Sequence, residues 1–150
     1  MAIKYNALGH VALRCNHFDE TYDFYVNKLH LEEKFRLNKD DGSLWLAYIH
    51  CGNGQYIELF PDSYDGDNRF ATHSQVHFCL EVSDFRAALE MIAAEGITVY
   101  NGPEQPVLNP PYEKKPLGMC GSLCAFIQDP EGNYIEIMQF TPKSMQINCL

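Results

Sequence analysis

The stretch Ala47–Leu59 reads AYIHCGNGQYIEL, and the chain repeats it at Ala125–Ile137 as AFIQDPEGNYIEI, without a gap and at an offset of 78 residues. A weaker match relates the run HVALR, which starts at His10, to the run HFCLE, which starts at His77, at an offset of 67. Self-similarity of this kind is typical of a duplicated supersecondary unit. Each copy therefore supplies one histidine early and one glutamate late, and both residue types bind metals.

Hydrophobic periodicity predicts a β-α-β-β-β order for the first copy. Alternation over 6–14 indicates a strand that puts His10, Ala12 and Arg14 on one face. Apolar side chains at spacings of three and four predict a helix over 19–29. Further strands are expected at about 33–37, 43–50 and 55–60, with a hairpin turn at Cys51–Gly54 between the last two.

The second copy repeats this order. Strands are expected at 77–82, 97–100, 122–128 and 133–139, and a helix should begin after Ser83 or Asp84 and close at Gly96. Asp129–Gly132 is the expected turn of the last hairpin. We therefore expect one domain over 1–150, made of two modules at about 5–62 and 74–141 with a polar linker at 61–75.

The growth of the offset from 67 to 78 gives the second copy 11 extra residues, which fall at 101–119. Five prolines exclude regular structure from this segment, and Lys114 and Lys115 give it local positive charge. A loop of this length is either a lid over a site or a flexible excursion.

Composition excludes several classes of function. The chain has 11 basic and 20 acidic residues, and the net charge of -9 repels a phosphate backbone, so nucleic acid is not expected as a partner. No apolar run approaches the roughly 20 residues that span a bilayer, and the first residues lack the apolar segment of a signal peptide. We therefore expect no membrane partner, a cytoplasmic location and free thiols at all six cysteines. The C-x3-C spacing of Cys120 and Cys124 is a weak zinc signal.

The repeated histidines and glutamates form a mixed nitrogen and oxygen donor set that suits Zn, Ni, Co, Mn or Fe(II), namely His10, Glu58, His77 and Glu136. An ionised carboxylate among apolar strand residues is costly unless it is paired or coordinated. Period two turns both glutamates to the same side as bulky neighbours, towards a sheltered concavity. The remaining histidines are interpreted as surface residues: His17, His30, His50 and His73.

At these residues the sequence resembles the vicinal oxygen chelate superfamily, the glyoxalase and bleomycin-resistance fold. The resemblance covers nearly the whole chain, and its landmarks are Gly9–Arg14, Phe24–Tyr25, His77–Val82 and Asp129–Glu136. It implies an α+β fold in which two tandem βαβββ modules form an open, barrel-like cleft of eight strands. It also implies one divalent ion on His10, Glu58, His77 and Glu136, with Zn or Ni ahead of Co, Mn or Fe. A homodimer is expected, because pairing of modules covers the sheet edges.

The ligand order His, Glu, His, Glu is similar to that of the glyoxalase I type. The resemblance therefore implies a metal-dependent lyase or isomerase that converts the hemithioacetal of a 2-oxoaldehyde, such as methylglyoxal with glutathione or another thiol, through an enediolate. Glu136 would be the catalytic base, and Glu58 a ligand or second base. Arg14 stands where that type has an arginine that contacts glutathione, whereas Leu59–Ser63 departs from the bacterial pattern for thiol binding.

Some roles and functions stay open at this point. Lys114 and Lys115 would hold the anionic end of the substrate together with Arg14, or they are simply solvated. The alternative functions are another metalloenzyme of the superfamily, an epimerase or a dioxygenase, and a protein that binds or sequesters a small molecule. The fourth ligand disfavours a dioxygenase, because it occupies a position needed for oxygen.

Overall fold

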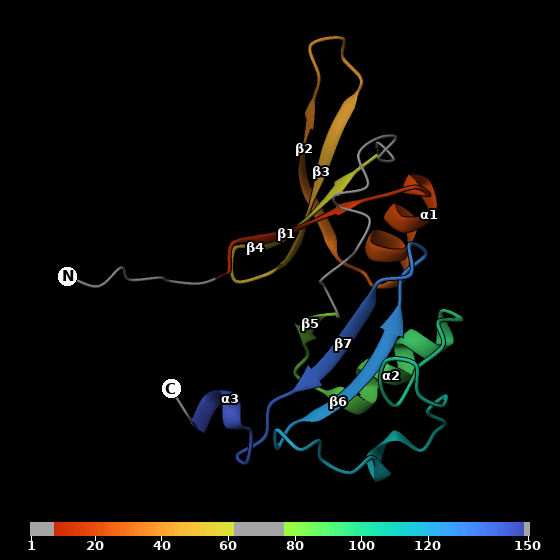
Figure 1. Ribbon diagram of the computed structural model, residues 1–150, viewed down its shortest axis with the longest axis vertical. Coiled ribbons are helices and arrows are strands. Elements are labelled where there is room, and N and C mark those ends of the chain that lie inside the picture. Colours follow the sequence, from red (N-terminus) through yellow and green to blue (C-terminus); the bar gives the residue numbers. More distant parts are fainter. Residues whose placement is uncertain (1–7, 62–76, 149–150) are drawn as a thin grey trace, which may run out of the picture. The chain divides into compact units, whose positions relative to one another are not determined.

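The computed structural model describes residues 8–61 and 77–148, which belong to two compact units, each with its own sheet (Figure 1). The first unit lies within residues 1–67 and the second within 68–150. The expected linker lies outside the described residues except for Pro61. No helix in the described ranges has both the length and the apolar character needed to cross a membrane.

Sheet A of the first unit has the strand order β1-β4-β3-β2. Strand β1 pairs with β4 in parallel, and the other pairs are antiparallel. This is the predicted β-α-β-β-β module, and all four predicted strands are confirmed: β1 (His10–Arg14), β2 (Glu32–Asn38), β3 (Leu44–Gly52) and β4 (Gln55–Phe60).

The predicted helix over 19–29 differs in its second half. Helix α1 (Phe18–Asp23) continues as the π-helical turn η1 (Phe24–Lys28), in which the Leu29 N–H donates to the Phe24 carbonyl five residues back, at 2.9 Å. The wider turn brings both Phe24 and Tyr25 into the core, with exposed fractions of 4% and 0%.

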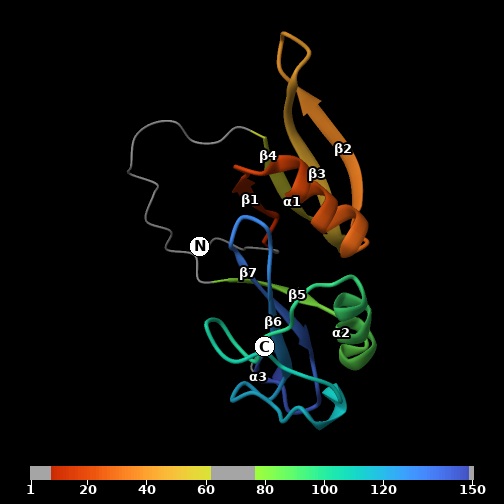
Figure 2. The ribbon, with the colours of Figure 1, turned by 90° about the vertical axis from the view of Figure 1, so that its right-hand side faces the viewer.

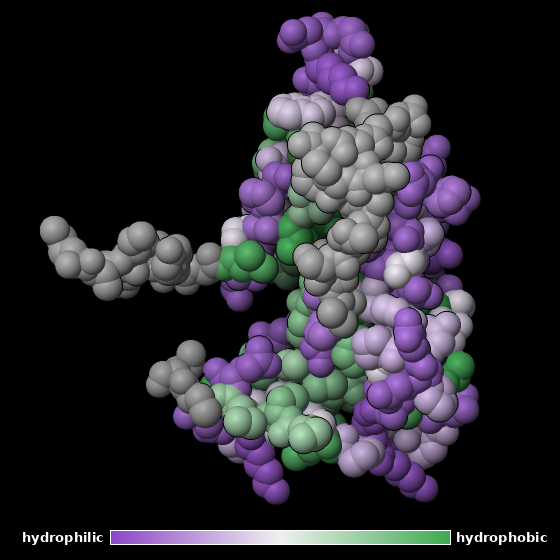
Figure 3. Space-filling model, viewed as in Figure 1, coloured by the Kyte–Doolittle hydropathy of each residue, from purple (hydrophilic) through white to green (hydrophobic). Residues whose placement is uncertain are grey.

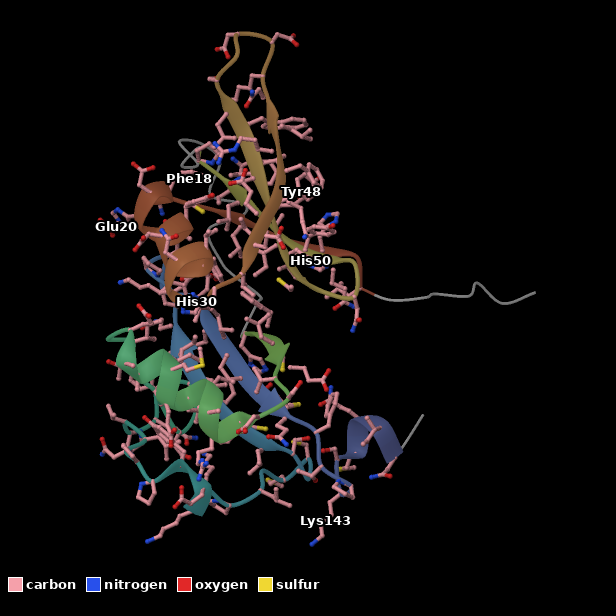
Figure 4. All side chains as sticks on the ribbon, turned by 180° about the vertical axis from the view of Figure 1, so that it is seen from behind. Phe18, Glu20, His30, Tyr48, His50 and Lys143 are labelled. Atoms are coloured by element: carbon pink, nitrogen blue, oxygen red, sulfur yellow. The ribbon has the colours of Figure 1, made fainter. Side chains whose placement is uncertain are left out.

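The two faces of sheet A differ in character. One face is apolar and buried, and its members are Leu13, Ala47, Ile49, Ile57 and Leu59. The opposite face carries Tyr48, Tyr56 and Glu58, because side chains alternate along a strand. Helix α1 lies against the first face, while the labelled Tyr48 and His50 lie on the other side of the sheet (Figure 4). The tip of the β2–β3 hairpin is strongly hydrophilic (Figure 3).

Sheet B of the second unit has the order β5-β7-β6, with β5 parallel to β7 and β6 antiparallel to it. Its strands are β5 (Phe78–Glu81), β6 (Leu123–Gln128) and β7 (Tyr134–Gln139). Helix α2 (Phe85–Ala94) lies alongside this sheet (Figure 2). The Asp84 carboxylate caps the helix by accepting from the Ala87 N–H at 3.0 Å, and Gly96, at φ +77°, closes it as predicted.

The strand expected at 97–100 is reduced to a single residue. Tyr100 forms isolated bridges with Phe126 and Val107. Pro103 and Pro106 follow closely and supply no N–H donor, so a strand cannot extend there. The described residues therefore form seven strands in two sheets, without a closed barrel, where eight strands were expected.

The segment 101–119 contains the short 3-10 helix η3 (Tyr112–Lys114), with the Tyr112 ring buried. After it, Gly121 approaches the chain before α3 (Met145–Asn148) so closely that a Cβ there would lie 2.0 Å from the Lys143 carbonyl oxygen. The described cysteines are free thiols, as predicted, and Cys149 lies outside the described residues.

Candidate metal centre

The first histidine and glutamate of the repeat meet on neighbouring parallel strands. Ala12 of β1 pairs with Glu58 of β4, and His10 shares the face of Ala12, so His10 and Glu58 are diagonal neighbours. The His10 Nε2 lies 3.7 Å from the Glu58 Oε1. Glu58 is only 7% exposed, whereas the His10 side chain is 54% exposed. This arrangement offers one nitrogen and one carboxylate ligand from the first unit.

The β3–β4 hairpin supplies a further partner for Glu58. Its turn uses positive φ angles at Gly52, Asn53 and Gly54, and the resulting register sets Tyr48 directly opposite Glu58. The Tyr48 hydroxyl donates to the Glu58 carboxylate, and this hydrogen bond raises the pKa of the Tyr48 phenol. A buried carboxylate thus keeps a hydrogen-bond donor in addition to the imidazole.

The second copy reproduces the histidine and glutamate pair. Cys79 of β5 pairs in parallel with Glu136 of β7, so His77 stands diagonal to Glu136 as His10 does to Glu58. The His77 Nε2 lies 3.3 Å from the Glu136 Oε2. Both glutamate side chains are sheltered, with side-chain exposures of 9% for Glu58 and 12% for Glu136.

The turn that positions Glu136 is built on the Asp129 carboxylate. Its Oδ1 accepts from the Glu131 N–H at 3.0 Å and from the Asn133 N–H at 2.8 Å. Its Oδ2 accepts from the Asn133 side-chain amide at 2.9 Å. Because these bonds close the β6–β7 hairpin, they fix the register between the two strands, in which Glu136 stands opposite Phe126.

Thiols rather than a phenol contact the second carboxylate. The Cys79 thiol donates a hydrogen bond to Glu136. The Cys124 thiol lies beside Glu136 but donates its one proton to the Ser122 carbonyl, at 3.7 Å. Partial desolvation by neighbouring atoms, together with the nearby Glu136 charge, raises the pKa of the Cys79 thiol to about 12 although its side chain is exposed, and the same causes raise the pKa of Cys124. The Cys120 Sγ lies 3.9 Å from the Cys124 Sγ. Hydrogen bonding to Ser122 lowers the pKa of the Cys120 thiol.

The donor chemistry of each pair fits a divalent cation. An imidazole nitrogen beside a carboxylate oxygen suits Zn, Ni, Co, Mn or Fe(II). Each pair supplies two of the four expected ligands, and no cluster of three or more His, Cys, Asp or Glu side chains that could hold an ion occurs within 8–61 and 77–148. The fit therefore rests on the residue types and on their closeness within each unit.

The other predicted site residues lie in different surroundings. Arg14 is exposed on the same face of β1 as His10, opposite Phe60 in the register. Lys115 donates to the backbone and side-chain oxygens of Asn101, which tie it to its own loop. Lys114 is the last residue of η3.

The interpretation of the spare histidines as surface residues needs one correction. His17 and His30 are exposed, and His73 lies outside the described residues. His50 is half-buried, and its ring lies 5.2 Å from that of Tyr56 on the face that carries Glu58. Sequence reasoning missed Tyr48 and His50 as neighbours of the site, although the hairpin register would have placed them there.

Comparisons with known proteins identify the family of the chain. Residues 7–137 match the family profile described as the Glyoxalase/Bleomycin resistance protein/Dioxygenase superfamily. A lactoylglutathione lyase of Neisseria meningitidis is 26% identical over 135 residues, which cover 88% of this chain and 89% of that protein.

Two solved structures share the fold. The lactoylglutathione lyase of Agrobacterium tumefaciens has a TM-score of 0.61 at 24% identity and covers 93% of this chain and 96% of its own. TnmS3, an antibiotic binding protein from Streptomyces sp. CB03234, has a TM-score of 0.62 at 17% identity and covers 93% of this chain and all of its own. With a family match over most of its length, the chain belongs to the glyoxalase, bleomycin resistance protein and dioxygenase superfamily.

Proposed function

We propose that this chain is a divalent-metal-dependent lyase of the glyoxalase I type, acting on the hemithioacetal of a 2-oxoaldehyde and a thiol. The observation that carries the proposal is the repetition of a close histidine and glutamate pair, at 3.7 Å in one unit and 3.3 Å in the other. Four ligands of this kind distinguish the glyoxalase I type within the superfamily. The resemblance to two lactoylglutathione lyases is consistent with it.

In this proposal His10, Glu58, His77 and Glu136 hold one ion. When bound, the ion acts as a Lewis acid that stabilises negative charge developing on the substrate oxygens. The Glu136 carboxylate would take the proton from the substrate carbon that bears the hydroxyl and the thiol sulfur, and would return it to the neighbouring carbonyl carbon, which leaves a 2-hydroxy thioester. Glu58 stays a ligand. Arg14 attracts the anionic end of the thiol, because it follows His10 on the same face of β1.

Metal content tests the ligand set. Protein purified without chelator is expected to contain Zn, Ni, Co, Mn or Fe by elemental analysis. His10→Ala and Glu136→Ala should each reduce the bound metal, because each removes one ligand. His17→Ala is the matched control, since it removes an exposed imidazole outside the pairs. Unchanged metal content in both ligand variants would exclude this site.

Turnover tests the reaction. Thioester formation from methylglyoxal is followed with glutathione and with other thiols, before and after removal and restoration of the metal. Glu136→Gln should lower kcat by roughly 10²- to 10⁴-fold, the usual contribution of a general base. Glu81→Gln, an exposed substitution at the end of β5, is the control. A metal-loaded protein that turns over no thiol adduct would defeat the lyase proposal.

One observation favours a second candidate, a protein that binds a small aromatic molecule. Aromatic rings cluster beside Glu58: Phe35 stacks on Tyr48 at 4.2 Å and meets Tyr56 at 6.0 Å. Phe35 is 45% exposed, which is unusual for a large apolar ring and leaves it open to a ligand. Saturable quenching of the intrinsic fluorescence by a planar aromatic compound, in a protein that lacks turnover, would favour this candidate.

A further inference from the structure

The two glutamates that the repeat makes equivalent differ in their hydrogen-bond donors. Tyr48 stands opposite Glu58, and the aligned residue of the second copy, Phe126, stands opposite Glu136. The Tyr48 hydroxyl donates to Glu58. Phe126 has no hydroxyl, and its ring lies edge-on to His77 at 5.3 Å.

The second copy differs from the first in the opposite way, because thiols lie beside Glu136 where the first copy has apolar side chains. Cys79 donates to Glu136, and Cys124, which donates its proton to the Ser122 carbonyl at 3.7 Å, lies beside that carboxylate. At the aligned positions the first copy has Ala12 and Leu46, which have no side-chain donor. Thus the carboxylate of the first copy accepts from a phenol, and that of the second accepts from the Cys79 thiol.

The two kinds of donor hold a carboxylate with different strength. A hydroxyl that donates to an ionised carboxylate makes a short, charge-assisted bond, whereas a thiol is a weak donor. The Tyr48 ring is also fixed in place. It stacks on Phe35 at 4.2 Å and meets the Tyr56 ring at 5.8 Å. The hydroxyl is therefore presented to Glu58 from a ring with little freedom to move.

We propose that Tyr48 is a positioning residue that fixes Glu58 as a permanent metal ligand and leaves Glu136 as the carboxylate able to leave the ion and carry the proton. This rests on the proposed function and divides its roles between the two glutamates. Partners that hold a ligand in this way commonly contribute 10- to 100-fold to metal affinity or activity.

The test uses a pair of Tyr→Phe variants. Tyr48→Phe removes one hydroxyl and keeps the ring stack. Tyr22→Phe is the matched control, because the Tyr22 hydroxyl donates to Glu33 at 2.5 Å in the same unit, away from the site. Metal affinity is measured on the metal-free full chain by competition with a chromophoric chelator, and the visible spectrum of the Co(II) form reports the ligand arrangement.

Tyr48→Phe is expected to weaken metal binding by about 10- to 100-fold and to change the Co(II) spectrum. Tyr22→Phe should leave both unchanged. The reciprocal variant Phe126→Tyr adds a phenol opposite Glu136 and should lower kcat while the protein still binds metal, because it restrains the base.

The outcomes separate the two proposals. If the parent chain binds metal and turns over, but Tyr48→Phe binds metal as tightly as Tyr22→Phe, the role of Tyr48 is overturned and the function stands. If the parent chain binds no divalent metal, the proposed function falls and this inference falls with it. Thermal unfolding of each variant shows whether a loss of affinity comes from a loss of fold.

Discussion

Substitution of Asp129 by alanine should destabilise the second unit more than any single cap of a helix does. The carboxylate is 4% exposed and accepts three hydrogen bonds from Glu131 and Asn133 in its own turn. A change to alanine removes both acceptor oxygens, and with them all three of these hydrogen bonds, and leaves sheltered N–H groups without an acceptor.

The magnitude follows from these bonds. Each hydrogen bond to a charged group contributes about 1.5–3 kcal/mol, and water recovers part of this in a surface turn. We therefore expect a loss of about 3–4 kcal/mol in the free energy of unfolding of the chain. In a protein of this size about 1 kcal/mol corresponds to roughly 2–4 °C, so the midpoint should fall by about 10 °C.

A graded series sharpens the test. Asp129→Asn keeps an oxygen for the two backbone N–H groups but turns an NH2 group towards the Asn133 amide. Its loss of free energy of unfolding should therefore be about one third of that of Asp129→Ala. Asp84→Ala is the control, since Asp84 accepts one capping bond from Ala87, worth about 1 kcal/mol.

Urea unfolding followed by circular dichroism gives the free energies, and hydrogen exchange shows whether protection is lost in β6 and β7. An Asp129→Ala variant that loses no more stability than Asp84→Ala would refute the reasoning. So would equal losses in the alanine and asparagine variants of Asp129.

Three further predictions concern thiols, pH and assembly. Iodoacetamide should alkylate Cys120 before Cys79, although Cys79 is the more exposed, because hydrogen bonding to Ser122 lowers the pKa of the first thiol, whereas desolvation and the Glu136 charge raise that of the second to about 12; peptide mass spectrometry measures the order, and equal rates would contradict it. The Arg36 guanidinium, bonded to Glu33 at 2.6 Å, lowers the pKa of that carboxyl below its ordinary 4.5. The stabilisation is therefore complete above pH 4.5 and is lost as the pH falls through the lowered value, so Glu33→Gln should flatten the acid limb of the stability curve. Light scattering should give twice the 17.2 kDa of one chain, because strands β1 and β2 end sheet A with edges that a second copy can cover; a monomer with metal bound would count against the dimer.

Local patterns predicted the elements of this fold well where short-range chemistry decides them. The Asn-Gly turn at 53–54 and the Asp84 cap depend on the preferences of single residues, and the structure has both. The prediction of a strand at 97–100 was wrong, because a strand needs a paired neighbour along its length. Pro103 and Pro106 prevent that pairing beyond Tyr100.

Other features could not be predicted because they depend on register or on packing. The π-helical turn after Asp23 follows from the burial of both Phe24 and Tyr25, whereas the spacing of the apolar residues fits an ordinary helix equally well. The donor at Glu58 requires the pairing of Tyr48 across the hairpin, which the repeat alone does not specify. For Lys115, the positive charge alone suggested a substrate contact, but it could not predict the hydrogen bond that the side chain donates to Asn101 in its own loop.

In this chain the two copies share their backbone register, whereas they differ in single side chains around the glutamates. In each unit the first strand pairs in parallel with the last, and the residue two places after the histidine stands opposite the glutamate, Ala12 in one unit and Cys79 in the other. Backbone register alone therefore brings each histidine to its glutamate, and a register is hard to change because a slip by one residue turns every side chain to the other face. The donors to the carboxylates are set by single side chains instead, and these are free to diverge. Two copies with the same register can in this way acquire one carboxylate beside a phenol and one beside thiols, which is the asymmetry that the proposed ligand and the proposed base require.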